Sequence, residues 1–321
     1  MKKNKILAIL GPTSSGKTKL AVQLAMEFNG EIVSADSRQV YRGMDIGTGK
    51  DLKQYCIKSK VIPYYLIDVV SPKTRFNLAK YQKLAFKAID DILQRGKLPI
   101  LVGGSGLYLQ AVVDNFQLFD SKPDLSLRKK LEKLTINQLF TKIKKLSPEM
   151  AIKINNSDKN NKRRLIRYAE ILLFDKNFKN NLLCSTKLKE KYQTLIIGLT
   201  CSKQILRKRI YDRLIYRLEK EKMIDEIKQF HQQGLSWRKL EEFGLEYKFI
   251  SLYLQKKLTY DEMVEKLNIA SNQFANRQMS WFRRWEQQGK KINWIENVTK
   301  SLLPNTAKAK KLIKMFLSTL F

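Results

Sequence analysis

The sequence predicts an α/β protein whose core is a parallel sheet, with a helical insert and a helical C-terminal region. Over the first 113 residues, short apolar runs alternate with segments of helical periodicity, which is typical of such a sheet. A stretch rich in Lys and Asn then interrupts the alternation, and a strand-like run returns after it. We therefore expect a core formed by residues 1–113 and 193–321, and a helical insert domain formed by residues 114–192.

The individual elements follow from the spacing of apolar side chains. Strands are predicted where short apolar runs are bounded by turn residues, at 5–10, 31–36, 64–70, 98–104, 194–200 and 291–296. Helical spacing of apolar residues predicts a helix over 77–95, a long helical region from 201 to 285, and a final amphipathic helix near 307–320.

The charge balance is the strongest bulk signal. Lys and Arg number 62 against 30 Asp and Glu, which gives a formal charge of +32. A lysine-rich surface explains part of this excess, and the rest favours a polyanionic partner such as nucleic acid. No apolar run approaches the length of a membrane span, and the apolar opening stretch is too short for a signal peptide. Three scattered cysteines fit a reducing compartment. We expect a cytoplasmic protein, monomeric and without membrane contact.

Residues 11–18, GPTSSGKT, match the phosphate-binding pattern G-x-x-x-x-G-K-[ST]. A predicted strand precedes the match and a predicted helix follows it, so the context is that of a P-loop NTPase-like core. The glycines let backbone N–H groups turn toward phosphate oxygens, and the helix N-terminus adds partial positive charge. Lys17 can bridge phosphates, and Thr18 can bind Mg²⁺ through its hydroxyl. The motif predicts a di- or triphosphate ligand and specifies no reaction.

A second acid that would hold the metal of an ATPase or kinase is not evident. The predicted strand 98–104 ends in glycines, and Asp68 is a substitute that serves equally well as a cap or turn residue. The phosphates can therefore be a leaving group. Asp36 follows the second strand at the sheet edge where ligands bind, so it either deprotonates a nucleophile or forms an Asx-turn.

Five stretches together resemble the tRNA dimethylallyltransferase family over nearly the whole chain. They occur in the family's order and spacing, at residues 11–18 (GPTSSGKT), 34–50 (SADSRQVYRGMDIGTGK), 103–112 (GGSGLYLQAV), 243–254 (FGLEYKFISLYL) and 276–285 (NRQMSWFRRW). The resemblance implies transfer of a dimethylallyl group from dimethylallyl diphosphate to the exocyclic amine of the adenosine 3′-adjacent to the anticodon. It also implies Mg²⁺ as cofactor.

The resemblance assigns the donor's diphosphate to the phosphate loop and to two arginines four residues apart on a predicted helix. The implied diphosphate-binding residues are Gly11, Thr13, Ser14, Ser15, Gly16, Lys17, Thr18, Arg209 and Arg213, with Thr18 as the metal ligand. The two arginines read equally as solvated helix charges. Asp36 corresponds to the family's general base. Ser105 stands where the family usually has threonine, and it reads both as a catalytic hydroxyl and as a helix N-cap.

The resemblance also implies contacts with the tRNA anticodon stem-loop. The implied residues are Asp36, Ser37, Arg38, Gln39, Ser105, Arg128, Arg163, Arg164, Arg167, Tyr247, Lys248, Arg277, Gln278, Trp281 and Arg283. Core packing is the competing interpretation for Trp281, Phe282 and Trp285. Asn276 departs from the family, which usually has a lysine there.

Three other functions share parts of this pattern. A small-molecule kinase has the same N-terminal motif but leaves the basic C-terminal helices unexplained. An adenylate isopentenyltransferase, which prenylates free adenine nucleotides, needs no large RNA surface. An RNA-binding protein that uses the loop as a nucleotide switch would hydrolyse a triphosphate without prenyl transfer.

Overall fold

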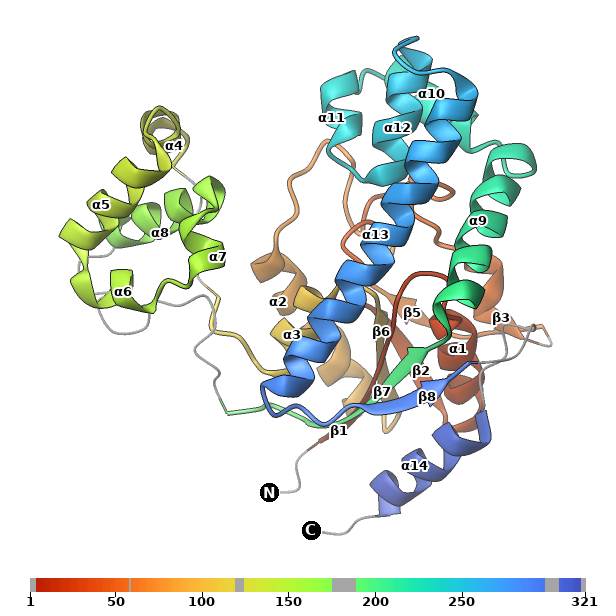
Figure 1. The fold of residues 1–321 in the computed structure, drawn as a ribbon. Helices are drawn as coiled ribbons and strands as arrows, with labels where there is room; N and C mark the ends of the chain where they lie inside the picture. Colours follow the sequence, from red (N-terminus) through yellow and green to blue (C-terminus); the bar gives the residue numbers. More distant parts are fainter. Residues whose placement is uncertain (1–3, 58, 119–123, 175–188, 298–305, 319–321) are drawn as a thin grey trace. The chain divides into compact units, whose positions relative to one another are not determined.

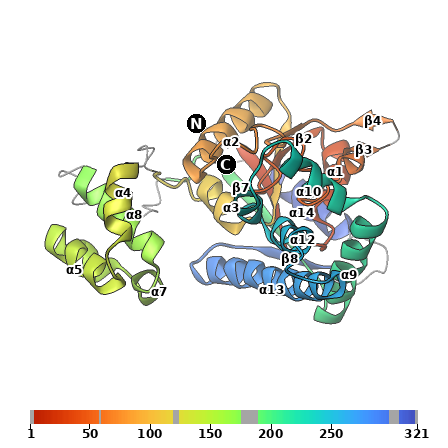
Figure 2. The same cartoon turned by 90° about the horizontal axis from the view of Figure 1, so that it is seen from above.

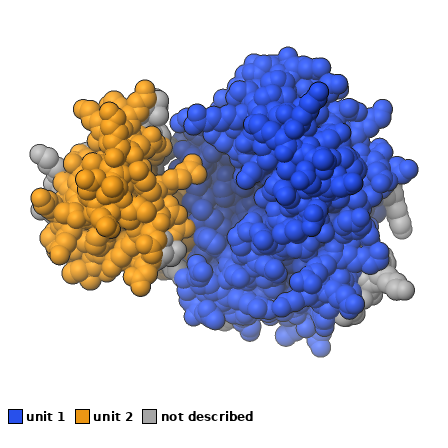
Figure 3. Space-filling view, turned by 45° about the horizontal axis from the view of Figure 1, so that its top comes forward, with its two compact units in different colours: residues 1–113, 190–321 blue, residues 114–189 orange. Residues whose placement is uncertain are grey.

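The computed structural model describes residues 4–57, 59–118, 124–174, 189–297 and 306–318. The chain divides into two compact units, one formed by residues 1–113 and 190–321 and the other by residues 114–189 (Figures 1 and 3). The first unit holds the sheet, and the second contains only helices among its described residues.

The first unit is built on a six-stranded sheet in the order β5-β2-β6-β1-β7-β8, with every pair parallel. The strands are β1 (Lys5–Leu10), β2 (Gly30–Ser34), β5 (Tyr64–Tyr65), β6 (Leu98–Gly103), β7 (Gln193–Thr200) and β8 (Asn293–Glu296). The carboxyl ends of the strands therefore meet at one edge, and the predicted α/β class is confirmed.

The predicted strand 64–70 is mostly wrong, because only its first two residues pair in the sheet. Leu66 and Asp68 have φ of 65° and 57°, a left-handed backbone that ends the extended run. A short antiparallel hairpin of β3 (Cys56–Ile57) and β4 (Lys60–Val61) was not predicted.

Helices cover both faces of the sheet, and the alternation of side chains along β1 shows the two layers. Ile6, Ala8 and Leu10 face a core shared with α2 (Leu78–Gln94), α3 (Gly106–Val113) and the end of α13 (Tyr260–Gln287). Leu7 and Ile9 face a core shared with α1 (Lys17–Glu27) and α14 (Thr306–Ser318). Both faces are covered, which explains why the central strands β1 and β6 have nearly continuous apolar sequences.

A third core forms beyond the sheet edge, among the C-terminal helices. These are α9 (Lys203–Glu219), α10 (Met223–Gln232), α11 (Trp237–Glu241), α12 (Leu245–Leu254) and α13, and α9 and α13 lie side by side (Figures 1 and 2). Val40, Tyr41 and Met44, from the segment after β2, are buried in the same cluster. A short 3₁₀ helix, η1 (Leu52–Tyr55), ends that segment. The segment after β2 is therefore anchored on the C-terminal helices.

The second unit has its own small core. It contains α4 (Leu125–Glu132), α5 (Ile136–Leu146), α6 (Pro148–Lys153), α7 (Asn156–Lys159) and α8 (Lys162–Phe174). Leu139, Ile143 and Leu165 are completely buried, and a capping box at Thr135 starts α5. This unit ends at residue 189 and not at 192, because Tyr192 is buried in the core of the first unit. In neither unit is any described helix long and apolar enough to cross a membrane.

Candidate active site

The phosphate loop connects β1 to α1 at the carboxyl edge of the sheet. Gly11 and Gly16 have φ of 152° and 91°, and a Cβ on Gly11 would lie 2.6 Å from the Leu199 carbonyl oxygen. Gly16 is the N-cap of α1 and gives it no side-chain cap, so the first-turn N–H groups point to a site for an anion. The Nδ2 of Asn297, just after β8, donates to the Ser15 carbonyl at 3.1 Å, and this hydrogen bond holds the loop against the end of β8.

Lys17 folds back over this loop. Its Nζ donates to the Pro12 carbonyl at 2.6 Å. Burial lowers the pKa of Lys17 to about 8, the charge of Asp36 opposes that shift, and the charge of Arg213 adds to it. The ammonium, the carboxylate and the guanidinium therefore lie within electrostatic range of one another. Thr18 is half-buried in the first turn of α1.

Gln278 of α13 connects the phosphate loop to the loop between β6 and α3. Its Oε1 accepts the Thr13 N–H at 2.8 Å, and its Nε2 donates to the Gly104 carbonyl at 2.9 Å. The side chain is buried, and a Cβ on Gly104 would collide with its Nε2. The sequence analysis expects Gln278 on the RNA, and in the structure its two side-chain polar atoms bond to these two loops.

Asp36 and Ser105 come from neighbouring strands β2 and β6. Asp36 Oδ1 accepts the Arg38 N–H at 2.8 Å, so the Asx-turn expected as the alternative is present. Ser105 Oγ accepts the Ser37 N–H at 3.1 Å, and the Ser105 N–H donates to the Ala35 carbonyl at 3.2 Å. Ser105 also starts α3, because its carbonyl accepts two N–H groups of that helix. The hydroxyl therefore helps to hold the segment that carries Asp36.

An aromatic pair lies close to Asp36. The rings of Tyr81 and Tyr108 are stacked with centroids 4.0 Å apart, and both side chains are buried. Burial raises the pKa of Tyr108, and the charges of Tyr41 and Asp36 raise it further. The charge of Asp36 also raises the pKa of Tyr81, so both buried rings lie within electrostatic range of the carboxylate.

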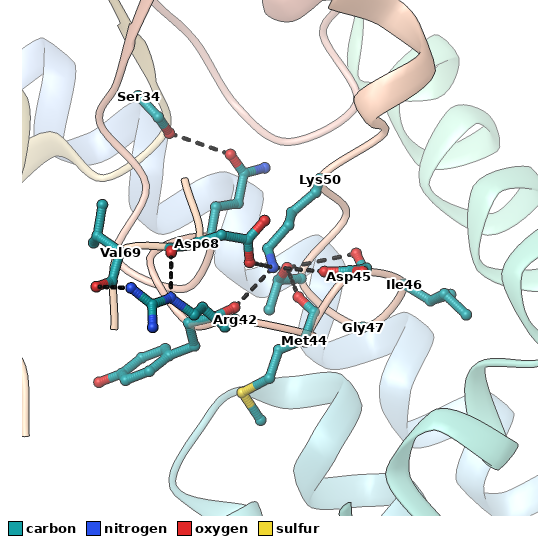
Figure 4. A network of polar contacts seen from close by, with 12 residues as sticks. Ser34, Arg42, Met44, Asp45, Ile46, Gly47, Lys50, Asp68 and Val69 are labelled. Carbon is teal, nitrogen blue, oxygen red and sulfur yellow. Dashed lines mark hydrogen bonds and ion pairs between the residues drawn. The ribbon is translucent and has the colours of Figure 1, made fainter. Parts of the chain in front are cut away.

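A network of polar contacts fixes the segment that follows Asp36 (Figure 4). The completely buried Lys50 donates to the Tyr41 carbonyl at 2.7 Å and pairs with Asp45 at 2.6 Å and with Asp68. Asp68, which the sequence offered as a metal ligand, is therefore engaged by a lysine. Gln39 is also engaged internally, because its Nε2 donates to the Gly49 carbonyl at 3.1 Å.

Glu226 of α10 anchors the same segment. Its carboxylate accepts the N–H groups of Asp45, Ile46 and Gly47 at 2.8, 2.7 and 3.0 Å. It also accepts the Tyr247 hydroxyl at 2.6 Å. Tyr247, which the sequence analysis expects on the RNA, is 1% exposed and bonds internally. The turn at 45–47 therefore binds the Glu226 carboxylate through three backbone N–H donors. Because the donors are backbone groups, the pattern of side chains in the sequence does not predict this contact.

Three arginines, Arg209, Arg213 and Arg217, are spaced four residues apart on α9, the helix that follows β7. Arg213 donates to Asp51 at 2.7 Å and to the Gly49 carbonyl at 3.3 Å. Arg209 lies by Cys201 at the end of β7 and offsets part of the rise that burial causes in the pKa of that thiol. Arg217 is buried and Glu246 is half-buried, and sequence reasoning singled out neither residue.

The predicted RNA contacts of the C-terminal helices differ in exposure. Lys248, Arg277 and Arg283 are exposed, and so is Arg38, which donates to the Glu242 carbonyl at 3.0 Å. Trp281 is half-buried, and its Nε1 donates to Gln110 at 3.1 Å. Phe282 and Trp285 are completely buried, as the core-packing interpretation predicts.

The predicted contacts of the helical unit are mostly paired within it. Arg128 and Arg167 both bind the buried carboxylate of Glu170, the second at 3.5 Å, and Arg164 pairs with Asp158. Arg163 is exposed. These ion pairs do not bury the arginines completely, because the side chains of Arg128 and Arg164 remain 30% and 50% exposed to solvent.

Comparison with known proteins gives one consistent result. A family model described as IPP transferase matches residues 39–285. The chain is 46% identical to tRNA dimethylallyltransferase 1 of Syntrophus aciditrophicus and 43% identical to that of Geotalea uraniireducens. The first alignment covers 92% of this chain and 94% of the relative, and the second covers 91% and 92%.

Solved structures agree. The crystal structure of the full-length tRNA isopentenylpyrophosphate transferase of Bacillus halodurans is 35% identical with a TM-score of 0.66, over 99% of this chain and 96% of that one. A eukaryotic dimethylallyltransferase described as acting on tRNA is 26% identical with a TM-score of 0.81, over 98% and 80%. With most of its length matched by the family model and by these relatives, the chain belongs to the IPP transferase family.

Proposed function

We propose that this chain is a tRNA dimethylallyltransferase. It transfers the dimethylallyl group of dimethylallyl diphosphate to the exocyclic amine of the adenosine 3′-adjacent to the anticodon, and diphosphate leaves. One observation carries the proposal: a phosphate loop and a carboxylate, Asp36, follow parallel strands at one sheet edge and influence each other through Lys17. The names of the relatives, each a tRNA dimethylallyltransferase, support the same reaction.

The donor half of the site stabilises the leaving group. As the bond between the allylic carbon and oxygen breaks, negative charge grows on the diphosphate. Loop N–H groups, Lys17 and Arg213 are positioned to neutralise that charge before the reaction starts, which is the most effective form of electrostatic catalysis. Arg209 completes the cationic side in this proposal.

The acceptor half supplies a base. The exocyclic amine of adenine is a weak nucleophile, because its lone pair is delocalised into the ring. Asp36 accepts the proton of that amine as the new C–N bond forms, which contributes about 10²–10⁴-fold to the rate. Ser105 holds the Asp36 segment through the Ser37 N–H. The adenine must leave its stack in the anticodon loop to reach the carboxylate.

We further propose Mg²⁺ as cofactor, held by Thr18 and by the diphosphate. The described ranges contain no group of three or more Asp, Glu, His and Cys side chains that would hold a metal alone. Magnesium usually takes one or two protein oxygens together with substrate phosphates, and the Thr18 hydroxyl beside the loop fits that donor set. The ion supplies further neutralisation of the departing diphosphate.

The tRNA partner accounts for the charge of the chain. We assign the anticodon stem-loop to the exposed cations Arg38, Lys248, Arg277 and Arg283, and in the helical unit to Arg128, Arg163, Arg164 and Arg167. These residues give phosphate contacts, and the half-buried Trp281, on the same helix as Arg277 and Arg283, offers part of its ring face for stacking. We expect the enzyme to act as a monomer, which sedimentation of the free protein measures.

The test is incubation with labelled dimethylallyl diphosphate and either tRNA or AMP. Label in a tRNA that has the anticodon-adjacent adenosine, and none when that base is changed, supports the proposal. Label in AMP alone, or ATP turnover without prenyl transfer, contradicts it. In the same assay Asp36→Asn should slow transfer at least about 100-fold while tRNA binding stays nearly constant. Asp91→Asn, an exposed acid on α2, is the matched control.

A further inference from the structure

One buried cation of the first unit has no role in the site described above. Arg217 of α9 is only 7% exposed. None of the described residues forms a hydrogen bond or ion pair with it, and its Nη2 is a buried donor without an acceptor. Burial and the charge of Arg213 lower the pKa of Arg217 to about 10, although the charges of Asp51, Glu246 and Glu221 oppose that shift, so the guanidinium remains protonated at neutral pH. A charged fork of five N–H donors is very unfavourable in that setting unless an anion joins it.

The fork of Arg217 lies against Gly49, next to the fork of Arg213. A Cβ on Gly49, which has φ of 68°, would lie 2.0 Å from the Nη2 of Arg217 and 2.6 Å from the Nη2 of Arg213. The arginines are four residues apart on α9 and so share a face of that helix. Only glycine leaves room for both guanidinium groups at this turn.

The acids nearby do not balance this pair. Asp51 forms its ion pair with Arg213. Glu246 is half-buried, and the charges of Arg217 and Arg213 partly offset the rise that desolvation causes in its pKa. The charges of Glu246 and Glu221 also act on Arg217, but neither acid bonds to either arginine among the described contacts. Two adjacent guanidinium groups therefore have one bonded carboxylate. The remaining donors suit an acceptor with several charged oxygens, and a phosphate group has that geometry.

The pair is electrostatically linked to the phosphate loop. Arg213 is close enough to Lys17 to lower the pKa of that ammonium. The cations therefore continue from Lys17 to Arg213, and from Arg213 to Arg217 at Gly49. We propose that Arg213 and Arg217 form a phosphate subsite that binds the outer phosphate of the donor's diphosphate. This inference rests on the proposed function, which names the diphosphate. The link to Lys17 favours that source over a phosphate of the RNA.

The experiment measures binding of inorganic diphosphate with Mg²⁺ to the full-length protein by calorimetry. Arg217→Met keeps the bulk of the side chain and removes the charge, so the dissociation constant should rise about 10- to 100-fold, as the loss of a charge-assisted contact predicts. The dissociation constant of Arg217→Lys should lie between those of the original protein and Arg217→Met, because an ammonium keeps the charge but lacks the planar set of guanidinium donors. Arg207→Met, an exposed change on the same helix, should bind as the original does.

Unfolding curves show whether each variant is folded, and Arg217→Lys carries the test if the methionine variant is not. Diphosphate binding that is unchanged in the folded variants overturns the subsite. A loss confined to binding of an anticodon stem-loop RNA also overturns it, and assigns the phosphate to the RNA. Prenyl transfer by the original protein is measured separately. A protein that binds diphosphate through Arg217 without transferring a prenyl group refutes the proposed function alone, and one that prenylates tRNA but binds diphosphate without Arg217 refutes the subsite alone.

Discussion

Replacing Gln278 by Met tests whether this side chain positions the two loops of the site. Methionine has a similar volume, so the change removes two hydrogen bonds without creating a cavity. The Gly104 carbonyl lies in a buried loop and loses its Nε2 donor, at a cost of about 1–3 kcal/mol. The half-buried Thr13 regains water more easily, so its N–H adds about 1 kcal/mol. We expect the free energy of unfolding to fall by about 2–4 kcal/mol.

Urea unfolding followed by circular dichroism measures this change, and calorimetry measures diphosphate binding by the same variant. Because the phosphate loop loses its contact with α13, we expect weaker diphosphate binding together with lower stability. Gln273→Met, an exposed change on the same helix, is the matched control. If Gln278→Met unfolds at the original urea concentration, binds diphosphate normally and loses only RNA affinity, the positioning role is wrong and Gln278 is an RNA contact.

Four further outcomes are expected. The affinity for diphosphate should decline as the pH rises above about 8, because Lys17 of the unliganded protein then loses its proton. Calorimetry should show that the affinity of Lys17→Arg depends less on pH, because arginine stays charged. Hydrogen bonding, chiefly from Arg95, lowers the pKa of Glu31 to about 2. The ionised carboxylate therefore contributes about 3 kcal/mol to the free energy of unfolding above pH 4.5, and this contribution is lost as the pH falls toward 2. The free energy of unfolding of Glu31→Gln, measured in urea, should depend less on pH in that window. Lys50→Met should lower the free energy of unfolding by about 2–4 kcal/mol, because it leaves Asp45, Asp68 and the Tyr41 carbonyl without their donor, and an unchanged urea midpoint would contradict this. Arg163→Ala should reduce the slope of log affinity for tRNA against log salt concentration by about one. Filter-binding titrations measure this slope, and an unaltered slope would show that Arg163 does not contact the RNA.

The architecture was predictable because the central strands of the sheet are buried on both faces. Continuous apolar runs such as 5–10 and 194–200 have few alternatives to a central parallel strand. The glycine spacing of residues 11–18 fixes the phosphate loop in the same local way. The expectation of a strand over 64–70 fails because the chain turns through left-handed backbone at Leu66 and Asp68, and leucine rarely adopts that conformation, so the apolar run gives no sign of the turn.

The roles of several site residues were not predictable, because they depend on partners distant in the chain. Gln278 and Tyr247 lie in stretches that resemble RNA-contacting segments, yet their polar atoms bind groups at 13, 104 and 226. Arg217 reads as one more charge on a basic helix. Only packing shows that it is buried and that Gly49 lies against it. The spacing of residues along a helix predicts which side chains share a face of that helix. It does not predict which parts of the chain pack against that face.

The groups that carry the chemistry lie near the start of the chain, and the groups that fix them lie near its end. Thr13 is held by Gln278, Ser15 by Asn297, and the turn at 45–47 by Glu226. A ribosome makes the N-terminal segments first, so a growing chain displays its phosphate motif long before these later residues emerge. A product truncated before residue 278 lacks the contacts that hold Thr13 and Ser15, so we expect it to bind diphosphate weakly.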